Sequence, residues 1–95
     1  MLNELFEIIL DRKAHPQPGS YTNQLLERGT DAILQKVGEE AVEVLLAAKG
    51  QGRQRLIEET SDLFYHTLVL LASQDVSLGE VEAELRSRHS SRKVA

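Results

Sequence analysis

Two short groups of acidic residues are the part of this sequence best suited to chemistry. The first is Glu39-Glu40-x-x-Glu43 and the second is Glu59-x-x-Asp62. Residues three or four apart lie on the same side of an α-helix, so each group lines one side of a predicted helix. Carboxylates gathered closely repel one another unless a cation lies between them. An all-oxygen ligand set favours a hard divalent ion, Mg²⁺ or Mn²⁺, over zinc.

The segment Gly50-Gln51-Gly52 separates the two groups and predicts a tight turn between antiparallel helices. Residues equally distant from Gln51 then lie at the same height in the hairpin. The level pairs are Glu43 with Glu59, Glu40 with Asp62, and Lys36 with His66. A single acidic group on a helix is usually only a solvated surface, but two groups at matching heights favour a metal site.

The remaining sequence predicts a single all-α domain over residues 1–95. Helical periodicity of apolar residues runs throughout, and no stretch alternates with the period of a strand. The expected helices cover residues 2–13, 21–28, a segment capped by Thr30 or Asp31 that ends near 49, 53–74, and a last one to about 88. A Ser77-x-x-Glu80 capping box opens the last helix, and Gly29 is expected to end the second in a left-handed helical conformation with positive φ.

Apolar positions on the two central helices predict both a core and a homodimer. The expected core stripe of the third helix comprises Ile33, Leu34, Val37, Ala41, Val44, Leu45 and Ala48. Val42 and Leu46 lie away from this stripe and from the acids, and the fourth helix is apolar almost all round. A second copy that covers these surfaces would form a four-helix core from two hairpins.

Composition narrows the classes of function. The chain of 95 residues has no cysteine, which excludes disulfides, thiolate zinc sites and cysteine nucleophiles. Its net charge of −4 argues against a basic surface for nucleic acid. No apolar run approaches the ~18 residues of a membrane span, and the first residues lack a basic signal-peptide region. We therefore expect a cytoplasmic protein with no membrane or nucleic-acid partner.

Three segments, residues 20–29, 36–43 and 58–66, together resemble the phosphoribosyl-ATP pyrophosphatase family. The acidic motif alone is similar to the wider all-α nucleoside triphosphate pyrophosphohydrolases of the MazG type. The resemblance covers roughly residues 2–89. It implies Mg²⁺-dependent hydrolysis of phosphoribosyl-ATP to phosphoribosyl-AMP and pyrophosphate by a homodimer. The oxygen ligands described above would also accept Mn²⁺ as a substitute. This reaction is the second step of histidine biosynthesis.

The resemblance also implies roles for individual residues. Glu40, Glu43, Glu59 and Asp62 would be the metal ligands, and Glu39 would orient or deprotonate the attacking water. The expected substrate contacts are Ser20, Tyr21, Thr22, Arg28, Lys36, His66, Arg86 and Arg88.

Several of these residues have simpler roles open to them. Ser20 or Thr22 could be a plain N-cap, and Arg86 and Arg88 could only complement a helix C-terminus. Lys36 could form an ion pair with Glu40, and His66 could be a hydrogen-bond partner of the acids rather than a ligand. The tail after His89 lacks the glycine expected of a phosphate-binding loop in this family.

Two other functions remain open at this point. A pyrophosphohydrolase of other nucleoside triphosphates would share the acidic motif. A helical module that only dimerises would carry the same hairpin without hydrolysing a nucleotide. A di-iron bundle is disfavoured because neither acidic group has the Glu-x-x-His pattern.

Overall fold

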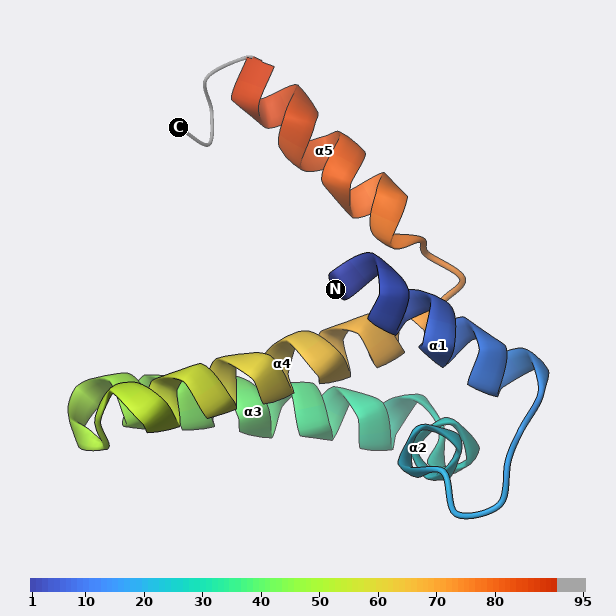
Figure 1. Ribbon diagram of the computed structural model, residues 1–95, viewed down its shortest axis with the longest axis horizontal. Helices are drawn as coiled ribbons and strands as arrows, with labels where there is room; N and C mark the ends of the chain where they lie inside the picture. The colour runs from blue at the N-terminus through green and yellow to red at the C-terminus, as the bar shows by residue number, and fades with distance from the viewer. Residues whose placement is uncertain (91–95) are drawn as a thin grey trace.

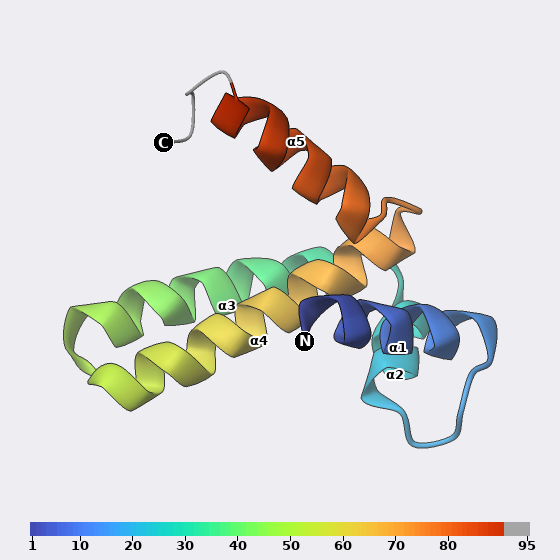
Figure 2. The same ribbon diagram turned by 45° about the horizontal axis from the view of Figure 1, so that its top comes forward.

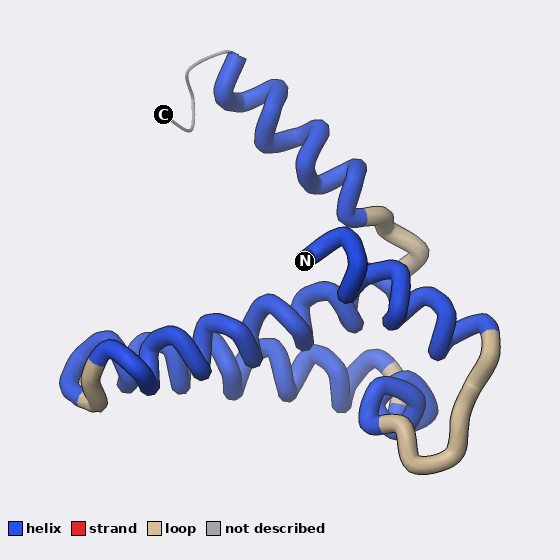
Figure 3. The backbone as a smooth tube through the Cα atoms, viewed as in Figure 1, coloured by secondary structure: helices blue, strands red, loops and turns tan. Residues whose placement is uncertain are grey.

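The computed structural model describes residues 1–90, and all regular structure within that range is helical (Figure 3). The helices are α1 (Leu2–Ala14), α2 (Tyr21–Arg28), α3 (Thr30–Gly50), α4 (Arg53–Ser73) and α5 (Leu78–Ser90). The predicted all-α class is confirmed, and each helix end lies within two residues of its expected place. No helix in this range is both long enough and apolar enough to cross a membrane.

The helices α3 and α4 form a long antiparallel hairpin that dominates the molecule (Figures 1 and 2). Gly52 makes the turn possible, because its backbone has φ 92° and ψ 167° as the N-cap of α4. That conformation is accessible almost only to glycine. The two acidic groups of the sequence therefore lie on neighbouring helices.

A small core lies at the end of the hairpin far from its turn. α1 packs across α4, and α2 packs against both α1 and α3 (Figure 1). The buried core residues are Phe6, Ile9, Leu25, Ile33, Leu68, Val69 and Ala72. Because α1 and α2 gather at this end, no other helix of residues 1–90 covers the half of the hairpin nearest the turn (Figure 2).

The helix caps agree with the sequence at Ser20 and at Ser77, and they differ at the start of α3 and at the end of α2. The hydroxyl of Ser20 accepts a hydrogen bond from the Asn23 amide at the start of α2. The predicted capping box is confirmed, since Ser77 and Glu80 each accept from the other's backbone amide. The expected cap of α3 by Thr30 or Asp31 was wrong: Gly29 is the N-cap, and no side chain caps the helix.

Gly29 also ends α2 differently from expectation. Its φ of 90° is positive as predicted, but its ψ of −176° gives an extended geometry rather than a left-handed helical one. This extended turn lets a single residue end α2 and begin α3, since the Gly29 amide bonds to Leu25 and its carbonyl accepts from Ile33.

The expected core stripe of α3 was only partly right. Ile33 is buried, but Leu34 and Leu45 are 48% and 68% exposed, and Ala48 is exposed as well. The buried positions are Ile33, Glu40 and Ala47, which recur every seven residues along the face toward α4. Glu40 thus lies on the packed side of α3, while a second apolar stripe faces outward.

The helix α4 is likewise not buried all round in the single chain. Leu56 and Ile57 are exposed near the turn, and Phe64 is exposed near the middle of the helix. Figures 1 and 2 show that α5 leaves the end of α4 and projects away from the body, and none of its residues is buried. Exposed large apolar side chains are therefore concentrated on α3 and α4.

Candidate active site

Three acidic side chains meet between α3 and α4. Glu40 from α3 and Glu59 and Asp62 from α4 each offer a carboxylate oxygen, and these oxygens lie within 4.8 Å of one another. Glu40 and Glu59 are almost buried, at 9% and 6% exposure, whereas Asp62 is exposed. The structure therefore brings together three of the four predicted metal ligands, in a cluster open to solvent on the Asp62 side.

Glu43, the fourth predicted ligand, lies outside this group of three but within electrostatic reach of it. Burial raises the pKa of Glu59, the Arg55 guanidinium lowers it, and the charges of Asp62, Glu40 and Glu43 raise it, with a net upward shift. The charged form of Glu59 is thus disfavoured in the absence of a further cation.

Two basic side chains flank the cluster, one from each helix. Lys36 Nζ on α3 lies 3.4 Å from Glu40 Oε1 and 3.7 Å from Glu39 Oε2. Burial lowers the pKa of Lys36, but Tyr21, Glu40 and Glu39 together raise it above its ordinary value. Of the roles open to Lys36, the ion pair with Glu40 is present in the structure.

Arg55 on α4 is the second flanking cation, and the sequence analysis missed it. Its Nη2 lies 2.5 Å from Glu59 Oε1, and its Nη1 lies 2.8 Å from Glu58 Oε1. The spacing of four residues between Arg55 and Glu59 is the pattern that could have identified this contact.

Glu39, the expected water-activating residue, lies beside the cluster rather than in it. Its side chain is 49% exposed, and its Oε1 accepts a hydrogen bond of 2.8 Å from the Gln35 amide. It shares Lys36 with Glu40. The position one residue before Glu40 turns it toward a different side of α3.

His66 connects α4 to the start of α2. Its Nδ1 lies 2.7 Å from the backbone carbonyl of Asp62, and its Nε2 lies 2.9 Å from the Tyr21 hydroxyl. A carbonyl can only accept, so Nδ1 carries the hydrogen, and in the neutral ring Nε2 accepts from Tyr21. His66 is therefore a hydrogen-bond partner in this structure, and Tyr21 is held at the edge of the site.

The neighbours of Tyr21 have structural partners. Ser20 is the N-cap of α2, as its simpler role required. Thr22 is buried and its hydroxyl pairs with that of Tyr65. Tyr21 itself is 43% exposed and stacks on Tyr65, with ring centroids 6.1 Å apart.

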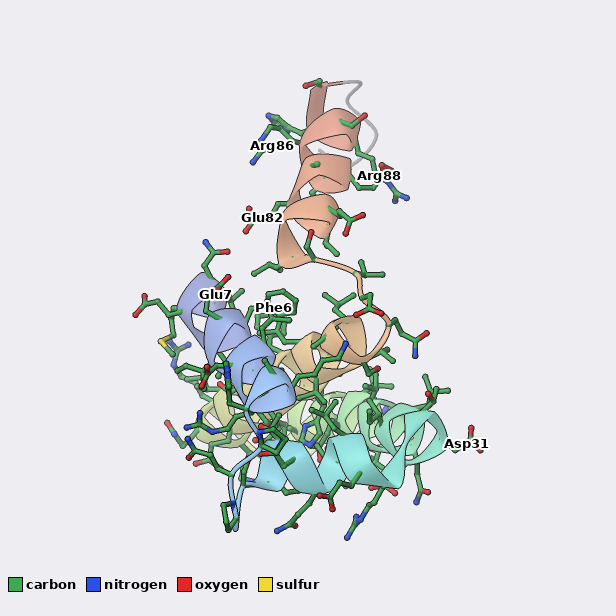
Figure 4. The ribbon with its side chains drawn as sticks, turned by 90° about the vertical axis from the view of Figure 1, so that its right-hand side faces the viewer. Phe6, Glu7, Asp31, Glu82, Arg86 and Arg88 are labelled. Atoms are coloured by element: carbon green, nitrogen blue, oxygen red, sulfur yellow. The ribbon has the colours of Figure 1, made fainter. Side chains whose placement is uncertain are left out.

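The three predicted arginine contacts are not brought to the acidic cluster of the same chain. Arg28 is exposed in the last turn of α2. Arg86 and Arg88 lie on the outer part of α5 and extend away from α1–α4 (Figure 4). Arg88 also lies 3.4 Å from Glu84 on its own helix. The tail discussed above, from residue 91 onward, lies outside the described residues.

Fold and site together define a class: an all-α domain whose central hairpin gathers carboxylates that could hold a divalent cation. The family model for phosphoribosyl-ATP pyrophosphohydrolase matches residues 2–89, and the chain belongs to this family.

Named relatives agree with this assignment. A phosphoribosyl-ATP pyrophosphatase of Listeria monocytogenes is 57% identical over 93% of this chain and 84% of its own. One from Geotalea daltonii is 50% identical over 93% of this chain and 83% of its own. A histidine biosynthesis bifunctional protein of Gloeobacter violaceus is 52% identical over 92% of this chain but only 39% of its own length.

Proposed function

We propose that this chain hydrolyses phosphoribosyl-ATP to phosphoribosyl-AMP and pyrophosphate, the second step of histidine biosynthesis, in the cytoplasm. The observation that carries the proposal is the carboxylate cluster of Glu40, Glu59 and Asp62 in a chain of this family. A polyphosphate is repelled by such a cluster unless a metal ion bridges the two, so the cluster and the substrate require the same cofactor.

The residues present fit Mg²⁺, with Mn²⁺ as a substitute. All donors are carboxylate oxygens, and two of the three residues are almost buried. Burial and the neighbouring carboxylates raise the pKa of Glu59 despite Arg55, so a divalent cation would favour its charged form. Glu40, Glu59 and Asp62 would hold the ion, with Glu43 as the fourth ligand. Bound Mg²⁺ would neutralise the charge that builds on the leaving pyrophosphate.

The protein's own residues handle the water and the substrate. Glu39 orients the water and accepts its proton as the water oxygen bonds to phosphorus and the phosphoanhydride bond breaks, its electron pair leaving with pyrophosphate. Lys36 lies between Glu39 and Glu40 and can move from these carboxylates to a phosphate oxygen. Tyr21, held by His66, contributes an exposed ring face and hydroxyl to the substrate.

The basic residues outside the cluster would bind the 5-phosphate. Arg28, Arg86 and Arg88 are the candidates, since guanidinium groups bind phosphate in a bidentate manner. Ser20 and Thr22 support this region through the capped and buried start of α2. The working form is a homodimer, which would cover the outward apolar faces of α3 and α4.

The test is an assay of pyrophosphate release from phosphoribosyl-ATP with Mg²⁺, beside ordinary and deaminated nucleoside triphosphates. We expect release from phosphoribosyl-ATP by the wild type, and a loss of at least about a hundredfold in Glu40→Gln and Asp62→Asn. Preference for another triphosphate would retain the hydrolase class and overturn the substrate. If no nucleotide released pyrophosphate, the result would favour a helical module that only dimerises.

A further inference from the structure

Arg55 makes an ion pair with which a divalent metal bound by the cluster would compete. Its guanidinium donates to Glu59, and Glu59 receives no other side-chain hydrogen bond among residues 1–90. Because Glu59 belongs to the acidic cluster, this contact places the guanidinium on the same side of α4 as the cluster. Arg55 is therefore the cationic side chain of α4 that contacts the acidic cluster.

A guanidinium and a divalent ion cannot both hold the Glu59 carboxylate at full strength. Each draws on the same carboxylate charge, and the two cations repel each other at this range. A metal bound by Glu40, Glu59 and Asp62 gains three ligands, whereas the Arg55 contact is a half-exposed ion pair worth little net free energy. The metal would thus displace Arg55 from Glu59.

The displaced side chain has room to move and a new partner at hand. Arg55 is 49% exposed and lies in the first turn of α4, on the half of the hairpin that no other helix covers. A triphosphate bridged to the cluster would bring phosphate oxygens next to the freed guanidinium, whose planar fork suits a bidentate contact.

We infer that Arg55 exchanges partners during the catalytic cycle: it neutralises Glu59 in the metal-free protein and binds the polyphosphate of the substrate once metal occupies the cluster. This inference rests on the proposed function and adds Arg55 to its substrate-binding residues. It predicts that removal of Arg55 changes the affinity for metal and the affinity for nucleotide in opposite directions.

The experiment measures both affinities in Arg55→Ala. Mn²⁺ binding without nucleotide, followed by the loss of the free-ion EPR signal, should tighten by up to about fivefold, since a competing cation is removed. The KM for phosphoribosyl-ATP at saturating metal should rise by about tenfold or more, because a charge-assisted contact to phosphate is lost.

Two matched variants separate this exchange from a simple change of charge. Arg53→Ala removes the same charge two residues earlier, at an exposed position where α4 begins, and should leave both quantities near wild type. Arg55→Lys keeps a charge without the planar fork, so Mn²⁺ affinity should stay close to wild type while KM rises.

The outcomes are distinct. Weaker or unchanged Mn²⁺ binding in Arg55→Ala, or an unchanged KM, would overturn the exchange while leaving the proposed function intact, provided the wild type binds Mn²⁺ and releases pyrophosphate. A wild type that does neither would overturn the proposed function and this inference together. Equal effects in Arg53→Ala would show that the change in net charge alone explains the result, and this would also overturn the exchange.

Discussion

At the scale of single residues, two adjacent glutamates of α4 lie in opposite environments. Glu58 is half-exposed and accepts hydrogen bonds from Gln54 and Arg55. These two hydrogen bonds lower its pKa, the one from Gln54 most. Glu59 is almost buried, and its pKa is raised by burial and by the neighbouring carboxylates despite Arg55. The charged forms of these two adjacent glutamates therefore contribute with opposite sign to the free energy of unfolding: folding favours the charge on Glu58 and disfavours the charge on Glu59.

This contrast predicts that Glu59→Gln stabilises the metal-free protein at pH 7. Since the raised pKa means that the folded state holds its proton longer than the unfolded chain, stability falls as pH rises from about 4.5, the ordinary value, through the raised one. The neutral glutamine avoids that loss. Thermal unfolding with EDTA should show a higher Tm at pH 7 and a gain that disappears near pH 4.

Glu58→Gln is the matched control. Its lowered pKa contributes a small stability that is present above the ordinary value and is lost as pH falls, so its substitution should leave Tm unchanged or slightly lower at pH 7. With metal present, Glu59→Gln should also lose the metal-induced rise in Tm. A Tm decrease in metal-free Glu59→Gln at pH 7 would contradict the conclusion that the charged form of Glu59 is disfavoured in the folded protein.

At the scale of elements, the geometry of the site depends on the turn between α3 and α4. We predict that Gly52→Ala destabilises the fold by about 1–3 kcal/mol, because its backbone conformation excludes a Cβ atom although no neighbour lies within 4 Å. Gly50→Ala, two residues earlier and inside the last turn of α3, should be neutral or stabilise by up to about 1 kcal/mol. Urea unfolding of both variants measures the difference, and equal effects would contradict a conformational role for Gly52.

The same elements show what the sequence could predict. Prolines, glycines and the capping box mark the helix ends because they act through the backbone locally. Equal distances from Gln51 place Glu40 opposite Asp62 because an antiparallel pair has a simple register. These inferences need only the geometry of one helix or one hairpin.

Predictions that required a choice of packing face were less successful. Leu34 and Leu45 form an apolar stripe on α3 as convincing as the buried one, so periodicity alone does not say which stripe meets α4. The partner of Arg55 and the exposed position of Arg86 and Arg88 depend on side-chain placement and on the direction of α5, which no local pattern encodes.

At the scale of the whole molecule, the single chain leaves too much apolar surface uncovered. The large apolar residues of α3 and α4 that are at least a third exposed are Leu34, Val42, Leu45, Leu46, Leu56, Ile57 and Phe64. Contiguous exposed patches of this kind mark interaction surfaces. The α3–α4 hairpin has two helices of the kind from which a four-helix core is made, and a second copy would supply the other two.

We therefore predict that Val42→Glu with Leu46→Glu converts a dimer into a monomer. Both side chains are half-exposed in the single chain, so the substitutions place charge where a partner would bury it while leaving the core of α1, α2 and α4 intact. Sedimentation or size-exclusion chromatography with light scattering gives the mass, and circular dichroism checks that the helices remain. Leu85→Glu, at a comparably exposed site on α5, is the control and should leave the mass unchanged. A folded double variant that keeps the dimer mass would contradict this face of α3 as the interface.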